Sequence, residues 1–130
     1  MRMLFAVAIL AVPLPFDAYA ETWMPVDKTA ISITGKVTFT PSKITFQNGK
    51  SLAIKAATDA GIDGQVFKVL KPADPQLIRG NTLCGRSTVK YILIVKPDRK
   101  SRGLSVYDGP NVPFQDTPSC ASYSYEVGPE

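Results

Sequence analysis

Apolar and polar residues alternate along most of the chain after residue 30. In segment 30–40, Ile31, Ile33, Val37 and Phe39 alternate with serine, threonine and lysine residues. A period of two is the spacing of a half-buried β-strand. Six further short runs, separated by turn residues, occupy positions 43–46, 51–56, 65–71, 88–96, 103–108 and 120–127. The pattern predicts an all-β fold, a small antiparallel sandwich or barrel of about seven strands, with one helical turn at 75–78.

The turn between the second and third predicted strands contains Asn-Gly, a strong hairpin signal. A two-residue turn there would pair Phe46 with Ser51, which opposes a core position with a surface position. A three-residue loop at 47–49 instead pairs Ile44 with Leu52 and gives its glycine the left-handed conformation that glycine adopts readily. We therefore predict the three-residue loop.

The most apolar strand, 88–96, carries apolar residues on both faces. One face holds Val89, Tyr91, Leu93 and Val95, and the other holds Ile92 and Ile94. A strand that is apolar on both faces is typical of a position inside the sheet, with both sides covered. We therefore expect this strand to be central.

Alternation also sorts the tyrosines into core and surface positions. Tyr91, Tyr123 and Tyr125 fall on the predicted core faces of their strands. Tyr107 falls on the face opposite Leu104, which points inward. Because tyrosine has an apolar ring and a hydroxyl that suit contacts with sugars, Tyr107 is the candidate for an exposed aromatic contact.

Residues 1–20 have the features of a secretory signal peptide. Arg2 provides a positive charge, an uncharged apolar stretch follows at 4–12, and small residues occupy the two positions that signal peptidase reads. The apolar stretch is too short to cross a membrane, which needs roughly 20 residues. We expect cleavage after Ala20, a single mature β domain at 21–130, a periplasmic or secreted location, and no membrane-spanning segment after cleavage.

The chain has two cysteines, Cys84 and Cys120, and no histidine. In an oxidising compartment such a pair forms a disulfide. Closing a loop of this length corresponds to about 3–4 kcal/mol of stabilisation in the chain-entropy model. A reactive thiol needs a base or a strongly electropositive site, and two sulfurs without histidine make a poor zinc site. We predict a structural disulfide.

Two segments around the cysteines form a recognisable framework. The first is Gly-Asn-x-Leu-Cys-Gly, made of Gly80, Asn81, Leu83, Cys84 and Gly85, and the second is Cys-x-x-Tyr-x-Tyr, made of Cys120, Tyr123 and Tyr125. This framework resembles that of a group of small, exported, uncharacterised bacterial proteins, and the resemblance covers most of the chain after residue 31. It implies export and the disulfide, and it implies no activity.

Basic residues exceed acidic ones, with a formal net charge of +4 that removal of residues 1–20 leaves unchanged. The densest group of charge is formed by Lys96, Arg99, Lys100 and Arg102. One interpretation is a mobile hairpin tip that contacts an anionic envelope polymer or an acidic protein. The other is a solvated loop whose positive charge is partly offset by Asp98 and serves to discourage aggregation. The charge lacks the dense basic stripe of a nucleic-acid-binding protein, so we expect no nucleic acid partner.

Signals of catalysis are weak. The lack of histidine excludes Ser-His and Cys-His mechanisms, and no nucleotide-binding glycine motif is present. Asp59 and Asp63 could bind Ca²⁺ or act as acid and base, but a Gly/Asp loop explains their spacing better. A small hydrolase that uses Asp59, Asp63, Asp108 or Asp116 is the weakest alternative. We predict no enzyme, no cofactor and no metal site.

The chain is thus expected to be a non-enzymatic, disulfide-stabilised β protein that binds at the cell envelope. Segment 96–102 is its leading contact surface, because a rigid β scaffold presents loops well. An alternative is a proteinaceous inhibitor of a lytic enzyme. Bacterial lysozyme inhibitors are also small exported β-barrels, and this alternative rests on that analogy of fold alone.

Overall fold

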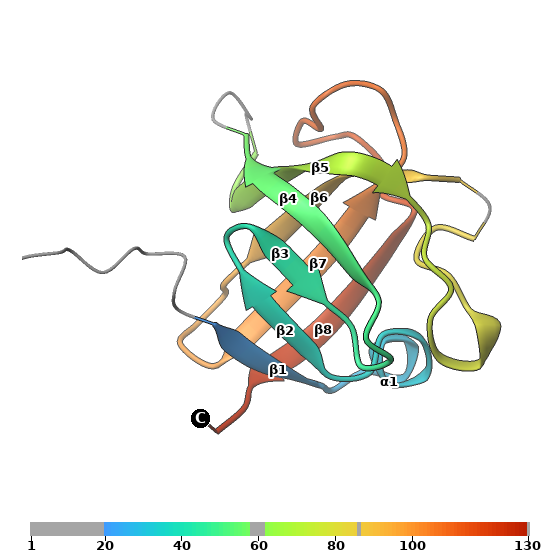
Figure 1. Cartoon of the computed structure of the whole chain (residues 1–130). Coiled ribbons are helices and arrows are strands. Elements are labelled where there is room, and N and C mark those ends of the chain that lie inside the picture. Colours follow the sequence, from blue (N-terminus) through green and yellow to red (C-terminus); the bar gives the residue numbers. More distant parts are fainter. Residues whose placement is uncertain (1–19, 58–61, 86, 130) are drawn as a thin grey trace, which may run out of the picture.

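The computed structural model describes residues 20–57, 62–85 and 87–129. Its eight strands form one closed antiparallel barrel in which each strand pairs with the next and the last pairs with the first (Figure 1). The strands are β1 (Glu21–Pro25), β2 (Val37–Thr40), β3 (Lys43–Thr45), β4 (Ser51–Ala56), β5 (Gln65–Ala73), β6 (Val89–Val95), β7 (Ser101–Tyr107) and β8 (Ala121–Val127). The prediction of an all-β fold is confirmed. Of the two predicted architectures, sandwich or barrel, the structure has the barrel. The number of strands is eight rather than about seven, because β1 was not predicted.

The structure corrects the first predicted strand. Residues Lys28–Ile33 form a short helix, α1, and only Val37–Thr40 of segment 30–40 form a strand. Asp27 begins the helix because its side chain accepts a hydrogen bond from the backbone N–H of Ala30 at 2.7 Å. Ala30 is consequently buried, whereas Ile31 is 56% exposed. The predicted helical turn at 75–78 is also misplaced, because a 3₁₀ turn, η3, occupies Ile78–Gly80.

The hairpin between β3 and β4 has the predicted three-residue loop. Ile44 pairs with Leu52, and the backbone N–H of Phe46 donates to the carbonyl oxygen of Lys50 at 2.8 Å. Gly49 has a φ of 92°, which an L side chain adopts only with strain. The register therefore keeps the four large apolar side chains of this hairpin on the interior face: Ile44, Phe46, Leu52 and Ile54.

Inward side chains pack against one another in the middle of the barrel. Trp23 stacks on Phe39 with 5.1 Å between ring centroids, and Phe39 meets the edge of Phe67 at 5.5 Å. Leu104 and Tyr123 are also inside, each 1% exposed. An eight-stranded barrel is just wide enough for such filling or for one small ligand.

A second buried cluster lies on the outer face of β5, β6 and β7. Its members are Val66, Tyr91, Leu93 and Tyr107, and partly buried residues of the connecting loops, including Ile62 and Val112, pack against it. Strand β6 is therefore covered on both faces, as expected of a central strand. Val89 departs from the predicted face and lies in the interior cluster, because the register between β5 and β6 shifts after Lys68.

The prediction that Tyr107 is exposed is wrong. Its side chain is 5% exposed, and burial raises the pKa of its hydroxyl. The alternation placed Tyr107 correctly on the outer face, but the long connection between β7 and β8 folds over that face and covers it. Tyr107 is thus part of a buried cluster rather than a contact surface.

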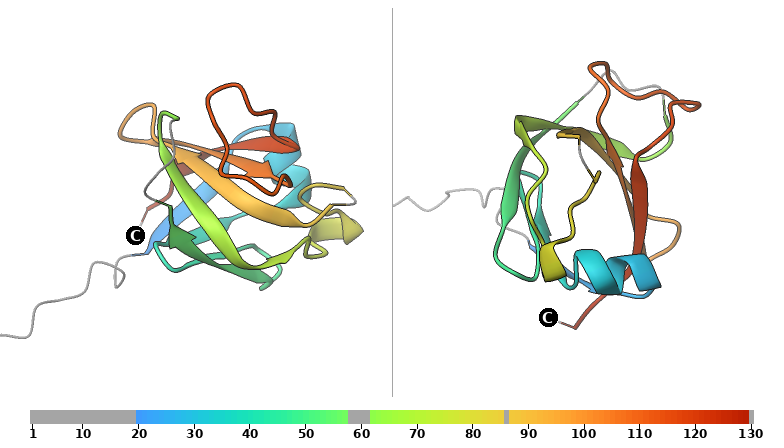
Figure 2. Two further views of the ribbon diagram at one scale, coloured as in Figure 1. Left: turned by 90° about the horizontal axis from the view of Figure 1, so that it is seen from above. Right: turned by 90° about the vertical axis from the view of Figure 1, so that its right-hand side faces the viewer.

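The two ends of the barrel differ in construction. At one end, called here the capped end, α1 and segment 74–85 lie across the opening (Figure 2, right view). At the other end, called here the mouth, β1 begins and the β2–β3, β4–β5 and β6–β7 connections turn back. The inward residues nearest this opening are Glu21, Pro41, Ala56, Gln65, Lys96 and Arg102.

Candidate functional site at the barrel mouth

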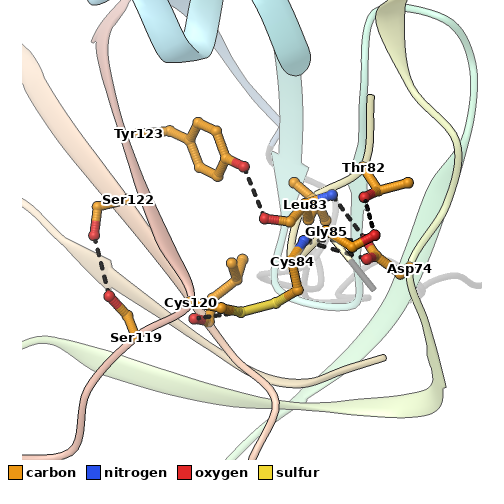
Figure 3. The surroundings of a disulfide bond; sticks show 10 residues. Asp74, Thr82, Leu83, Cys84, Gly85, Ser119, Cys120, Ser122 and Tyr123 are labelled. Atoms are coloured by element: carbon orange, nitrogen blue, oxygen red, sulfur yellow. Dashed lines mark hydrogen bonds between the residues drawn. A yellow bond between two sulfur atoms is a disulfide. The ribbon is translucent and has the colours of Figure 1, made fainter. Parts of the chain in front are cut away.

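Cys84 and Cys120 form the predicted disulfide at the capped end, with 5.3 Å between their Cα atoms. The Asp74 carboxylate holds the segment before the bond, because it accepts hydrogen bonds from the backbone N–H groups of Leu83 at 2.7 Å and Cys84 at 3.2 Å (Figure 3). The Tyr123 hydroxyl donates to the Leu83 carbonyl oxygen at 3.0 Å. The two segments of the cysteine framework therefore meet in one group of bonded residues that closes this end of the barrel, called here the plug.

Helix α1 is joined to the same plug by neutral hydrogen bonds. The hydroxyls of Thr34 and Tyr125 lie 2.8 Å apart and both side chains are buried. The side-chain amide of Asn81 donates to the carbonyl oxygen of Ser32 in the helix at 3.3 Å. Burial raises the pKa of Tyr123 to about 12 and that of Tyr125 still further. These hydroxyls therefore stay neutral, and they support the capped end through hydrogen bonds.

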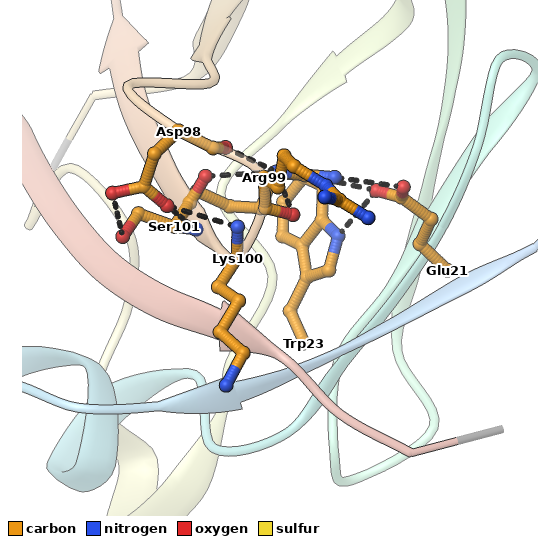
Figure 4. Close-up of polar contacts among 7 residues, drawn as sticks. Glu21, Trp23, Asp98, Arg99, Lys100 and Ser101 are labelled. Atoms are coloured by element: carbon orange, nitrogen blue, oxygen red, sulfur yellow. Dashed lines mark hydrogen bonds and ion pairs between the residues drawn. The ribbon is translucent and has the colours of Figure 1, made fainter.

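The mouth contains an ion pair that the sequence interpretation missed. Arg102 donates to both carboxylate oxygens of Glu21, at 3.0 Å from Nε and 2.9 Å from Nη2. Trp23 Nε1 donates to the same carboxylate at 2.9 Å (Figure 4). The hydrogen bond from Arg102 is the main cause that lowers the pKa of Glu21 to about 2, assisted by Trp23 and by the charge of Lys96.

The prediction that Arg102 is a free surface cation is therefore wrong. Its side chain is 7% exposed, because β7 alternates and directs Arg102 to the same interior face as Leu104. Its Nη1 also donates to the carbonyl oxygens of Asp98, Arg99 and Ser101, at 3.3, 3.4 and 2.9 Å. Arg102 thus holds the β6–β7 turn over the barrel wall.

The other three basic residues of the turn are exposed. Lys96, Arg99 and Lys100, called here the tip cations, lie in the β6–β7 connection. Asp98 forms no ion pair with them: its carboxylate accepts hydrogen bonds from the backbone N–H groups of Lys100 at 2.9 Å and Ser101 at 2.8 Å, which lower its pKa. The Lys100 ammonium points away from that carboxylate (Figure 4). Within the described ranges, the single ion pair is the one between Arg102 and Glu21.

Three pockets surround the mouth, and each is bordered by a tip cation. The first, of about 290 Å³, opens into the barrel and is lined by Phe39, Pro41, Ala56, Gln65, Phe67, Ile94 and Lys96. The second, of about 590 Å³, adjoins it and is lined by Asp63, Gly64, Gln65, Ile94, Val95, Lys96 and Pro97. The third, of about 530 Å³, is lined by Arg99, Lys100 and Val127. Positive charge and concave surface therefore coincide at this end.

Gly64 shapes the second pocket because it lets the β4–β5 connection approach β6 closely. Its φ is 106°, and a Cβ atom at this position would stand 2.8 Å from the carbonyl oxygen of Ile94. Such a contact is far shorter than real Cβ atoms allow, so a larger residue would push the loop away from the strand. The glycine keeps Asp63 and Gln65 beside the mouth.

The candidate aspartates belong to two connections, β4–β5 and β7–β8. Asp59 lies outside the described residues. Asp63 borders the second pocket at the mouth, and its backbone N–H donates to Oε1 of Gln115, the residue before the exposed Asp116, at 3.4 Å, whereas Asp108 follows β7 at the capped end. In the part of the chain that the structure describes, no group of three or more histidine, cysteine or acidic residues could hold a metal ion.

The fold and the mouth define a small up-and-down β-barrel with one capped end and one end at which exposed cations border pockets. No protein-family model, curated protein or solved structure matches the chain. Among the described residues, no helix is long and apolar enough to span a membrane. The geometry and charge of the mouth are therefore the features of this chain that indicate a function.

Proposed function

We propose that the protein is a non-enzymatic binding protein of the cell envelope, periplasmic or secreted, which contacts an anionic polymer or an acidic protein through its mouth. The observation that supports this most directly is the position of the tip cations. All three are exposed beside concave surface, and none has an ion-pair partner among the described residues.

The β6–β7 turn is organised before any partner arrives. Arg102 binds three of its carbonyl oxygens, and Asp98 binds two of its backbone N–H groups. A turn that is already ordered loses little conformational entropy on binding. Its cations can therefore contribute attraction to carboxylate or phosphate groups without a large ordering cost.

The test compares two variants that remove the same charge from different places. The tip variant replaces Lys96, Arg99 and Lys100 with glutamine, and the wall variant replaces Lys36, Lys50 and Lys71, which are exposed on the part of the wall nearest the capped end. Arg102 is left in place because it is structural. We expect the tip variant to elute from a carboxylated or phosphorylated matrix at clearly lower salt than the wall variant, since exposed charge contacts weaken with ionic strength.

Equal elution of the two variants would show that net charge, rather than the mouth, causes retention, and would contradict the proposal. Unchanged elution of the tip variant would contradict it as well. Circular dichroism of both variants provides the control for folding, because each replaced side chain is exposed and outside the core clusters.

An inhibitor of a lytic enzyme is the second proposal, and the pre-organised tip supports it. Glycoside-cleaving enzymes carry paired carboxylates in their clefts, which are complementary to a rigid turn bearing three cations. The expected result is a 1:1 complex with a lytic glycosidase in size-exclusion chromatography, lost in the tip variant and kept in the wall variant. Enzyme activity that the protein leaves unchanged would exclude this role for the glycosidase tested.

A further inference from the structure

We propose that the 290 Å³ pocket in the mouth binds a small carboxylate with an apolar body, such as a short acyl chain. This site goes beyond the proposed polymer contact, with which it shares only Lys96. Mouths of β-barrels are a preferred place for small-molecule sites, and eight strands leave room for one small ligand.

The floor of the pocket is apolar and aromatic. Phe39, Phe67 and Ile94 line it, and each belongs to the interior core cluster with at most 8% of its surface exposed. The two rings meet edge to face at 5.5 Å, so they present a stiff surface. Pro41 and Ala56 add apolar side walls. The lower part of the pocket therefore favours a hydrocarbon body over a polar one.

The size of the pocket restricts the ligand to a small one. Ligand pockets commonly have volumes of about 300–1,000 Å³, and this pocket lies at the lower limit with about 290 Å³. Ala56 sets part of that volume, because it is the smallest side chain in the lining. A short acyl chain or a single ring suits this volume better than a large ring system.

The rim selects the head group. Lys96 continues the inward alternation of Ile92 and Ile94 beyond the end of β6, which places it over the pocket beside Gln65. Glu21 also lies at the mouth, but its carboxylate oxygens already accept hydrogen bonds from Arg102 and Trp23. Asp63 borders the adjoining pocket and is absent from the lining of this one. An anionic head group thus finds the Lys96 ammonium as its donor here, beside a Gln65 amide that already donates to the carbonyl oxygen of Val66 at 3.0 Å.

The test uses three probes with the same tail and different heads: octanoate, 1-octanol and octylammonium. Amide chemical shifts of the isotope-labelled protein are followed during titration. We expect saturable 1:1 binding of octanoate, with the largest shifts at the amides of Phe39, Phe67 and Ile94. Octylammonium should bind at least about 2- to 5-fold more weakly than octanoate, since one exposed charge contributes modestly to the free energy of binding.

Two variants test separately how the pocket binds the apolar body of the ligand and its anionic head group. Ala56→Phe fills the pocket and should weaken octanoate binding more than 10-fold, while its intact tip cations should keep the protein on the anionic matrix. Lys96→Met should leave octanol binding unchanged and remove the preference for octanoate. If Ala56→Phe proves unstable, Ala56→Leu serves the same purpose with less volume.

Octanoate shifts that spread over the surface without saturating would overturn the pocket proposal. So would equal octanoate binding by Ala56→Phe and the unchanged protein, or equal binding of octanoate and octylammonium. If any of these results is obtained while the tip variant loses its retention on the anionic matrix, the pocket proposal is wrong and the polymer-binding proposal is still supported. The two proposals therefore fail independently.

Discussion

The two ends of the barrel join their chain segments with different chemistry. At the capped end, a disulfide, the Tyr123 hydroxyl and the Asp74 carboxylate join segments that are distant in sequence. At the mouth, the joining element is an ion pair between Glu21 and Arg102, surrounded by pockets and exposed cations. The capped end joins its segments through a covalent bond and buried hydrogen bonds, whereas the mouth places exposed cations beside concave surface.

This difference indicates a division of labour. Covalent closure and buried neutral hydrogen bonds stabilise a fold without offering anything to a partner. Exposed charges contribute little to stability when they stand alone, but they attract oppositely charged molecules over several ångströms. We therefore expect substitutions at the capped end to change stability and substitutions at the mouth to change binding.

Replacement of both cysteines should have the largest effect. Cys84→Ala combined with Cys120→Ala removes a bond that spans 36 positions of the sequence, and the free energy of unfolding should fall by about 3–4 kcal/mol. Urea denaturation followed by circular dichroism measures this. The folded double variant should still bind the anionic matrix as the unchanged protein does. A loss below about 1 kcal/mol would mean that the cap is held by its other contacts.

Tyr123→Phe should have the next largest effect. It leaves the buried carbonyl oxygen of Leu83 without the hydroxyl that now donates to it, at a cost of about 1–2 kcal/mol. Tyr125→Phe is the matched control and should cost less, because the Thr34 hydroxyl still reaches the carbonyl oxygens of Ala30 and Gly35. In the cysteine-free variant the cost of Tyr123→Phe should shrink, since the two interactions hold the same segment. Equal costs in both backgrounds would contradict this coupling.

Glu21→Gln tests the ion pair of the mouth through its pH dependence. The pKa of Glu21 is about 2 in the folded protein and 4.5 in its unperturbed state. A lowered folded pKa gives stability that is present above about pH 4.5 and is lost as the pH falls towards 2. Because the Glu21 side chain is 33% exposed, solvent screening limits the effect to about 1–2 kcal/mol at pH 7.

The unfolding free energy of Glu21→Gln should therefore vary less between pH 5 and pH 2 than that of the unchanged protein. Glu126→Gln is the control, because Glu126 is exposed on the outer face of β8. An acid dependence that is the same in both variants would show that the ion pair does not stabilise the fold.

The sequence predicted the elements that a period of two determines. The hairpin loop at 47–49, the inward faces of β7 and β8 and the disulfide are all confirmed. These features depend on local alternation, on the conformational freedom of one glycine, and on a cysteine pair with a single partner choice. Each can be derived from residues that are close in sequence or unique in it.

The features that the sequence interpretation missed depend on context. Segment 30–33 alternates like a strand, but Asp27 provides an N-cap and Val26 and Ile31 occupy the positions of a hydrophobic staple, a signal that could have been recognised. Tyr107 was placed on the correct face, and only a long connection that folds back covers it. Arg102 shares the period of Leu104 and Val106, so alternation marks it as interior although its charge is typical of a surface position.

The pocket in the mouth could not be predicted because it is assembled from four strands. Phe39, Ala56, Phe67 and Ile94 come from β2, β4, β5 and β6, and only the closure of the barrel brings them together. The registers on either side of β5 also had to be known, and one of them shifts after Lys68. A pocket of this kind follows from topology rather than from a motif.

The tip variant should have the smallest effect on stability, within about 0.5 kcal/mol. Glutamine at positions 96, 99 and 100 keeps the backbone N–H groups that bind Asp98 and the carbonyl oxygens that bind Arg102. Loss of Lys96 removes a minor contribution to the lowered pKa of Glu21, so the acid transition should move slightly upward in pH. Urea denaturation at pH 7 and at pH 3 measures both effects. A loss above 1 kcal/mol at pH 7 would mean that the tip cations hold the mouth together, and the proposed separation of stability from binding between the two ends would be wrong.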